Sequence, residues 1–345
     1  MKPLVTFIVT TFNVENFIED CVNSIINQKL VPFEYEIIIV DDFSIDNTRI
    51  FLNLLKKKYL NINLVFNKKN LGPGISRNIG LKFARGKYII FIDGDDFINK
   101  SLLFYIQKSL NKNYDLIFYN FNLLKKGVIY GSRKDTQYLK NKKIILKNYI
   151  QLKLDTSVIY CAIKKTIIKT NKINFLKGVY EDIPYLFKLI FFSKNYYYCR
   201  KKLYYKNFRK NSIIHSVSKK KFSDYVFSYF QILKFIHSKK NINADEINSF
   251  KIGYAGILGS YLEQVFYSNL NKYDKNKLYN FMYNFYVNNN SLNLENYYFF
   301  TQKDKITEKF LFLYSNNNIK LAYKKFILYL ENNKVVQKNS FTLKI

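Results

Sequence analysis

Residues 88–96 have the sequence YIIFIDGDD, which predicts a buried strand that ends in an acidic turn. A run of five apolar residues is typical of a strand that is covered on both faces of a parallel sheet. Asp93, Asp95 and Asp96 follow it within four residues, and carboxylates this close repel one another unless a cation lies between them. Hard divalent ions such as Mg²⁺ and Mn²⁺ prefer oxygen ligands. The turn is therefore a candidate metal site, and a solvated acidic turn is the alternative.

Three more apolar runs of strand length precede this stretch, at Leu4–Thr10, Tyr35–Val40 and Ile62–Phe66. Apolar residues at helical spacing separate the runs, with Asn13 as the expected N-cap of the first helix. The alternation predicts the α/β class, with a mostly parallel, Rossmann-like sheet flanked by helices. Ligands of such sheets bind beyond the carboxyl ends of the strands, so the polar residues that end each strand are candidate site residues.

The composition sets the class of protein and the compartment that we expect. Among 345 residues, 48% are hydrophobic, which is enough for a packed core. The three cysteines are odd in number and far apart, so they predict neither a disulfide framework nor a zinc site. The apolar runs are strand-sized, whereas a spanning helix needs about 20 residues, and the N-terminal run is too short for a signal peptide. We therefore expect a cytoplasmic protein.

The charge is unevenly distributed along the chain. Residues 1–120 hold 15 Lys and Arg against 12 Asp and Glu, whereas residues 121–345 hold 41 against 13. A polyanionic neighbour of the second part would explain this excess, and so would a lysine-rich composition with solvated side chains. Only 6 of the 56 basic residues are Arg, and Arg is the side chain that binds guanine edges and phosphates in bidentate fashion. Nucleic acid is therefore an unlikely partner.

Four motifs in order resemble those of family 2 glycosyltransferases. They are Phe7–Asn13, Ile37–Thr48, Asn70–Gly80 and Tyr88–Asp96, and together they span about a quarter of the chain. The resemblance implies a GT-A fold, a nucleotide-sugar donor, a divalent cation (Mn²⁺ or Mg²⁺) and an inverting mechanism. The chain departs from the family pattern at Thr10, where Pro is common, at Phe12, where Tyr is common, and at Phe43, where Gly is common. With Phe12, stacking on the base survives but one hydroxyl contact is lost.

The resemblance also implies roles for single residues. The residues that match its nucleotide-sugar-binding positions are Thr10, Phe12, Asp41, Arg77 and Asp93. Thr10, Phe12 and Asp41 match positions that hold the nucleobase, and Arg77 matches a basic position near the nucleotide. In the family's D-x-D element, Asp95 would ligate the metal, and Asp93 would meet the ribose or reach the metal through water.

A later acidic pair, Glu181-Asp182, is the candidate for the catalytic base. The inverting reaction needs a carboxylate that deprotonates the acceptor hydroxyl. The pair resembles the family's later E-D element, in which the Asp is the base, so Asp182 is the expected base and Glu181 would position it or the acceptor. The alternative is a helix start that the macrodipole favours.

Residues 205–215 resemble the segment that closes the family's catalytic domain. This resemblance makes Arg209 a candidate phosphate partner and His215 a candidate metal or phosphate ligand. A lone His is more often an ordinary surface or core residue, and we assign no role to His237.

The remainder of the chain predicts a smaller helical region. Apolar faces at helical spacing begin near residue 222. We therefore expect a catalytic domain over residues 1–220 and a helical region over 221–345. The lysines and aromatic residues of this region suit docking on an anionic cytoplasmic membrane, and a homo-oligomer contact is the alternative.

The expected function is transfer of a sugar, with a UDP-sugar as donor, to a hydroxyl of a growing surface glycan such as a lipopolysaccharide core, a capsule or a glycolipid. Two alternatives come from other classes. A basic nucleic-acid-binding protein would bind bulk DNA in a salt-sensitive manner and would hydrolyse no nucleotide sugar. A metal-dependent nucleotidyltransferase would release pyrophosphate instead of a nucleoside diphosphate.

Overall fold

The computed structural model describes residues 2–29, 31–132, 141–155, 157–208 and 217–288. The chain divides into two compact units, the first of residues 1–146 and 156–209 and the second of residues 147–155 and 210–345. Most of the second unit is thus residues 210–345, and it also includes the short segment 147–155 from the middle of the chain. The hydroxyl of Tyr229 donates to the carbonyl of Ile150, which ties that segment to the second unit.

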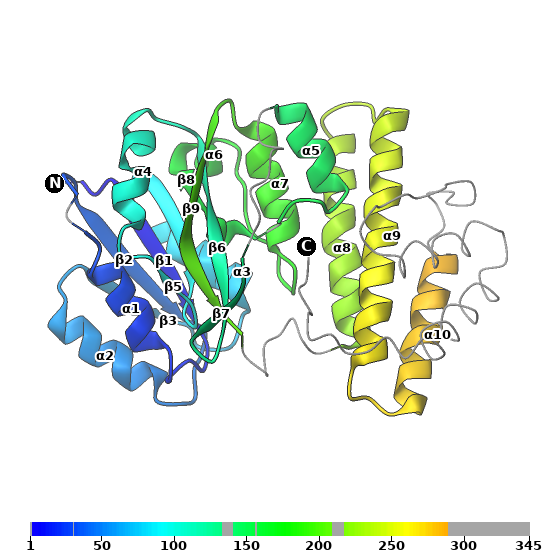
Figure 1. Ribbon diagram of the computed structural model, residues 1–345, viewed down its shortest axis with the longest axis horizontal. Coiled ribbons are helices and arrows are strands. Elements are labelled where there is room, and N and C mark those ends of the chain that lie inside the picture. Colours follow the sequence, from blue (N-terminus) through cyan, green and yellow to red (C-terminus); the bar gives the residue numbers. More distant parts are fainter. Residues whose placement is uncertain (1, 30, 133–140, 156, 209–216, 289–345) are drawn as a thin grey trace. The chain divides into compact units, whose positions relative to one another are not determined.

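A nine-stranded mixed sheet forms the centre of the first unit (Figure 1). Its order is β3-β2-β1-β4-β8-β6-β9-β5, with β7 paired to β6. The first four strands are parallel, β8 is antiparallel to β4 and β6, and β9 is parallel to β6. The strands are β1 (Val5–Thr11), β2 (Tyr35–Asp41), β3 (Ile62–Phe66), β4 (Tyr88–Asp93), β5 (Phe97–Ile98), β6 (Leu116–Lys125), β7 (Val128–Ser132), β8 (Cys161–Lys164) and β9 (Tyr196–Asn207). The predicted strands are confirmed.

The helices of the first unit follow the predicted alternation. They are α1 (Ile18–Ile26), α2 (Thr48–Lys58), α3 (Pro73–Phe83), α4 (Leu102–Asn111), α6 (Lys165–Thr170) and α7 (Asp182–Phe192), and α5 (Lys142–Ile150) crosses into the second unit. One prediction is wrong, because Asn13 does not cap α1. Its φ of 51° is left-handed and its side chain accepts from the backbone N–H of Ile45, so it joins two loops instead.

The core lies where apolar strand residues meet the inner faces of the helices. Residues 37–40 of β2 and 88–92 of β4 are fully buried, as continuous apolar runs predict for strands with both faces covered. On α1, the buried residues Ile18, Cys21, Val22 and Ile25 recur at helical spacing. Burial of these side chains is the main favourable free energy of the unit.

A buried carboxylate ties three segments together at the end of the sheet opposite the strands' carboxyl ends. Glu36 accepts from the Thr6 hydroxyl at 2.6 Å, from the Arg85 and Gly86 backbone N–H groups and from the Arg85 Nε at 2.9 Å. Burial by itself would raise the pKa of Glu36, but these hydrogen bonds and the Arg85 charge lower it. Glu36 therefore stabilises the fold in its ionised form.

The second unit is helical over its described residues. α8 (Lys219–His237), α9 (Ala244–Tyr267) and α10 (Lys272–Asn288) pack on one another (Figure 1). Asn243 and Glu246 form a capping box that starts α9. The apolar positions that we predicted beyond residue 288 lie outside the described residues. Within the part that the structure describes, no helix is long and apolar enough to cross a bilayer.

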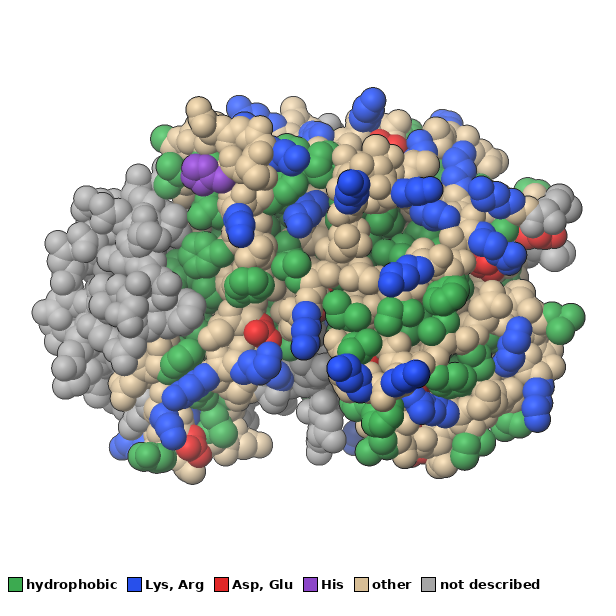
Figure 2. Space-filling view, turned by 180° about the vertical axis from the view of Figure 1, so that it is seen from behind, with side chains coloured by type: hydrophobic (Ala, Val, Ile, Leu, Met, Phe, Trp, Pro, Cys, Tyr) green, Lys and Arg blue, Asp and Glu red, His purple; other side chains and the backbone are tan. Residues whose placement is uncertain are grey.

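Figure 2 shows the basic side chains of one face. Lys and Arg lie scattered over it among hydrophobic and neutral side chains, and the coloured residues of this view gather into no single basic patch.

We expect Glu36→Gln to lower stability at pH 7 by about 1 to 2 kcal/mol, because the new amide N–H₂ would face the Arg85 donor. Since the folded pKa of Glu36 is lowered, its stabilisation exists above the unfolded pKa and is lost as the pH falls through the folded value. Urea unfolding at pH 7 and pH 3 should show a smaller difference from wild type at pH 3. An equal difference at both pH values would contradict this account, and Glu19→Gln, exposed on α1, is the matched control.

Candidate active site

The carboxyl ends of β1, β2 and β4 meet at one edge of the sheet. In the register, Thr10 lies opposite Asp93 and Thr11 opposite Asp41. The turn after β4 approaches β1 closely, since the N–H of Gly94 donates to the carbonyl of Thr10 at 2.8 Å. A Cβ on Gly94 would lie 2.7 Å from the Thr11 side chain, so a glycine is needed at this place. The strand-end residues that the sequence singled out are thus neighbours.

Arg77 is the centre of the site. Its buried guanidinium donates through Nη2 to Asp93 at 2.8 Å and through Nη1 to Glu181 and, at 3.1 Å, to Asp182. Burial disfavours its charge, but the three carboxylates raise its pKa, so it remains a cation. The position of Arg77 near the nucleotide stays a prediction, and the structure adds that three acids bind its guanidinium. Arg77 thus joins the end of β4 to the start of α7.

Asp182 is held from two sides. Its Oδ1 accepts from Arg77, and its Oδ2 accepts from the Ser157 hydroxyl at 2.9 Å and from the backbone N–H of Val158. The side chain keeps 17% of its surface exposed, so the carboxylate is oriented but still open to a reactant. No local pattern singles out Ser157, because only the fold brings it to Asp182.

Glu181 is buried between α3 and α7. Gly74 of α3 lies so close that a Cβ there would come within 2.7 Å of the Glu181 side chain. Burial first, and the charge of Asp182 second, raise the pKa of Glu181 to about 7, while Arg77 opposes them. Burial thus disfavours the ionised form of Glu181, and the bond from Arg77 favours it.

The acidic turn after β4 divides into residues with different surroundings. Asp96 is buried and accepts from the Tyr204 hydroxyl at 2.8 Å and from the backbone N–H of Asn207. Burial and the neighbouring Asp95 and Asp93 raise its pKa. Asp96 thus anchors the turn to β9, whereas Asp93 and Asp95 are partly exposed.

The donor set suits a divalent ion that is held partly by a substrate. Asp93 and Asp95 supply carboxylate oxygens, and Mg²⁺ is usually bound by one or two carboxylates together with substrate phosphates. In the described part of the chain, no three His, Cys, Asp or Glu side chains converge into a site that could hold a metal ion. The predicted ligand His215 and the predicted phosphate partner Arg209 lie outside the described residues.

Asp41 is surrounded by donors that the sequence analysis did not predict. Its carboxylate accepts from Thr11 Oγ1 at 3.2 Å, from the N–H and hydroxyl of Ser44, and from Arg49 Nε at 2.6 Å. A carboxylate has about four acceptor positions, so Asp41 would bind a base only by exchanging one donor. Its neighbour Asp42 accepts from the N–H groups of residues 71 and 72 and thereby fixes the loop before α3.

The other predicted residues lie as follows. Thr10 is buried at the end of β1, and Phe12, in the next loop, is 40% exposed. His237, to which we assigned no role, is exposed at the end of α8.

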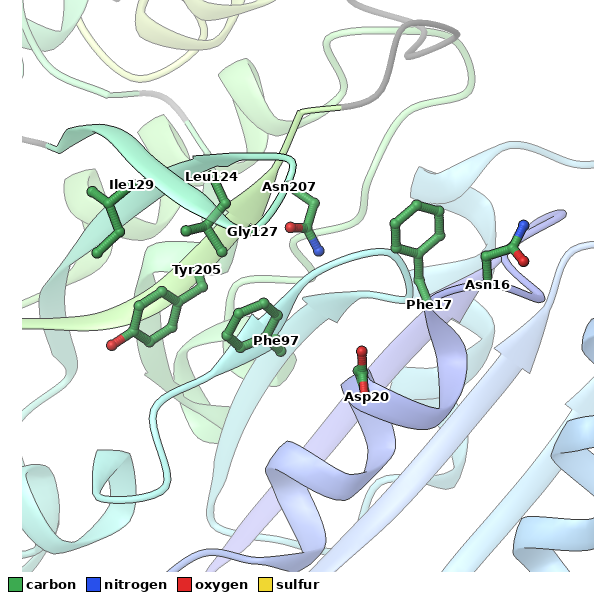
Figure 3. A pocket seen from close by; sticks show the side chains of 9 residues that line it. All are labelled: Asn16, Phe17, Asp20, Phe97, Leu124, Gly127, Ile129, Tyr205 and Asn207. Atoms are coloured by element: carbon green, nitrogen blue, oxygen red, sulfur yellow. The ribbon is translucent and has the colours of Figure 1, made fainter.

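A pocket of about 480 Å³ lies near the acidic turn (Figure 3). The rings of Phe97 and Tyr205 stack at a centroid distance of 4.9 Å in its wall. Asn207 lines the pocket and donates to the carbonyl of Asp95 at 2.6 Å, so the pocket wall is bonded to the turn. The pocket combines apolar surface with the amide groups of Asn16 and Asn207 and the carboxylate of Asp20.

We expect Glu181→Gln to change how stability depends on pH. Because the folded pKa of Glu181 is raised, its stabilisation is present below about pH 4.5 and is lost as the pH rises through about 7. The free energy of unfolding of wild type should therefore fall between pH 5 and pH 8, whereas that of the variant should not. The difference between the two proteins should change over this range by an amount on the order of 3 kcal/mol, in favour of the variant. Thermal unfolding in EDTA measures this difference, and parallel curves for the two proteins would show that Glu181 does not titrate in this range.

Comparison with known proteins identifies the domain. Residues 6–170 match the family model described as glycosyl transferase family 2. A poly(ribitol-phosphate) beta-glucosyltransferase of Bacillus spizizenii is 40% identical over 100 residues, which are 29% of this chain and 16% of that protein. A GalNAc(5)-diNAcBac-PP-undecaprenol beta-1,3-glucosyltransferase of Campylobacter jejuni is 25% identical over 71% of this chain and 77% of that protein. The chain thus spans less than two thirds of the first relative.

The fold has a solved counterpart. The crystal structure of S. aureus TarS 1-349 in complex with UDP-GlcNAc superposes with a TM-score of 0.64 at 20% identity, covering 96% of this chain and 92% of that one. The mixed sheet with its flanking helices is therefore the GT-A fold that the motifs implied. Residues 6–170 thus match glycosyl transferase family 2, the family that the four motifs resemble.

Proposed function

We propose that the protein is an inverting glycosyltransferase that transfers a sugar from a UDP-sugar to a hydroxyl of a surface glycan or a lipid-linked glycan. The observation that carries the proposal is the Arg77 cluster, in which one buried guanidinium bonds both Asp93 and Asp182. The strand-end acid would face the donor through a divalent ion that binds the diphosphate, and the helix-start acid suits the hydroxyl of the acceptor. An inverting displacement needs these two functions close together and facing the same anomeric carbon.

The donor half lies at the carboxyl ends of the strands. Phe12 offers a half-exposed ring for the base, and Thr10 and Asp41 border the same edge. Asp95, with Asp93, would hold Mn²⁺ or Mg²⁺. When bound, the ion would act as a Lewis acid that neutralises charge on the leaving diphosphate. The guanidinium of Arg77 is buried, so it holds Asp93 in place without covering the exposed surface of the site.

The acceptor half depends on Asp182. Its carboxylate is the group that would accept the proton of the acceptor hydroxyl as that oxygen bonds to the sugar. Arg77, Ser157 and the Val158 N–H fix its orientation. Glu181 shares the guanidinium and so positions the base instead of reacting.

The product distinguishes this function from its nearest alternative. A nucleotidyltransferase would also use a metal and paired acids, but it would release pyrophosphate. The glycosyltransferase releases a nucleoside diphosphate, and slow hydrolysis of the donor by water releases the same product. A panel of nucleotide sugars with Mn²⁺, assayed separately for UDP, GDP and pyrophosphate, tests the proposal.

We expect Asp95→Ala and Asp182→Asn to separate donor binding from turnover. Asp95→Ala should remove the Mn²⁺-dependent part of UDP binding and also turnover, since a metal ligand is lost. Asp182→Asn should keep UDP affinity within about 2-fold and lower turnover roughly 100-fold or more, the usual effect of losing a general base. Calorimetry and a UDP-release assay measure the two quantities.

The exposed Glu19→Gln is the control for both variants and should behave as wild type. Two results would contradict the assignment of roles. They are full turnover by Asp182→Asn and unchanged Mn²⁺-dependent UDP binding by Asp95→Ala.

We also propose that the lysine-rich part of the chain rests on an anionic membrane surface, where a lipid-linked acceptor would lie. The lysine excess after residue 120 supports this. The full chain should sediment with vesicles that contain phosphatidylglycerol but not with phosphatidylcholine vesicles, and 0.5 M NaCl should release it. Equal sedimentation with both vesicle types would contradict electrostatic docking.

A further inference from the structure

Phe43 has a backbone conformation that a bulky residue seldom adopts. Its φ is 69°, in the left-handed region, where a side chain with a Cβ is strained and glycine is not. Its ring is nevertheless 41% exposed, so the strain is not explained by burial of the ring in the core. Strained residues persist where the surrounding structure holds them, and they cluster at functional sites.

The ring of Phe43 is backed by a fixed cation. The Arg49 guanidinium lies 5.4 Å from the ring centroid of Phe43 and 5.3 Å from that of Phe66, so it contacts both rings. Arg49 is itself held by Asp41 at 2.6 Å and by the carbonyl of Asn67 at 3.1 Å. These contacts form a Phe43–Arg49–Phe66 column, and the column gives the exposed aromatic ring a rigid support.

The column borders the nucleotide end of the site. The loop that carries Phe43 is joined to the loop that carries Phe12, because the N–H of Asn13 donates to the Ser44 hydroxyl at 2.9 Å. The N–H of Ile45 donates back to Asn13 Oδ1 at 2.9 Å. Two half-exposed aromatic rings, from the ends of β1 and β2, thus belong to one cross-linked pair of loops at the strands' carboxyl edge.

From this geometry we propose that Phe43 is a stacking face for the nucleobase of the donor. The proposal rests on the proposed function and adds to it a residue that determines base affinity. A flat apolar ring, fixed from behind and open to solvent, suits the π-face of a base, and an aromatic ring stacks on every base. Asp41 borders the base site. Because it also holds Arg49, it supports the stacking ring through the column.

The experiment is calorimetry of UDP with Mn²⁺ on the full-length protein and on Phe43→Tyr, Phe43→Leu and Phe43→Gly. The tyrosine variant should bind as wild type does. The leucine and glycine variants should bind roughly 10-fold more weakly, the effect of losing one aromatic stacking partner of a base. Phe43→Gly should also keep its unfolding temperature within a few degrees, because glycine adopts the left-handed conformation without strain. Ile45→Ala, on the same loop and 82% exposed, is the control and should keep wild-type affinity.

The outcomes separate this inference from the function on which it rests. If the wild-type protein binds no UDP, GDP or CDP, both the proposed function and the role of Phe43 are overturned. Wild-type binding with equal affinity in the leucine and glycine variants would overturn only the role of Phe43. An equal loss in Ile45→Ala would also overturn it, because the cause would then be disruption of the loop.

Discussion

The buried guanidinium of Arg77 is the constraint on which the site depends. A cation out of water is stable only when anions and hydrogen bonds replace its hydration, and three carboxylates do so here. The same carboxylates would repel one another without the cation. Arg77 therefore fixes the distance between the end of β4 and the start of α7, and with it the spacing of the acids that we assign to the two reactants.

Strain at the edge of the sheet accompanies this electrostatic arrangement. Asn13, Phe43 and Tyr180 have positive φ, and they lie in the loops after β1 and β2 and just before α7. At the other end of the sheet, the Glu36 network joins the strands without such conformations. The loops after β1 and β2 thus combine left-handed residues with exposed aromatic rings, and they lie at the edge that carries the partly exposed acids.

Much of the first unit could be predicted because its signals are local. Continuous apolar runs predicted β1 to β4, and the position of polar residues directly after them predicted the edge at which the site lies. The prediction for Asn13 was wrong for a local reason as well: an asparagine before an apolar helix suits an N-cap, but it also suits a left-handed loop position. Only the partner loop decided between the two.

The amino-acid sequence alone determined the fold class, the family motifs and the acids of the acidic turn, since each depends on neighbours within a few residues. The tertiary structure decided which charges meet. Arg77 lies more than 100 positions from Glu181 and Asp182, and Ser157 lies 25 positions from Asp182. Pattern and periodicity describe which face of an element is buried, but the partner of a buried charge is set by long-range packing, which no local pattern contains.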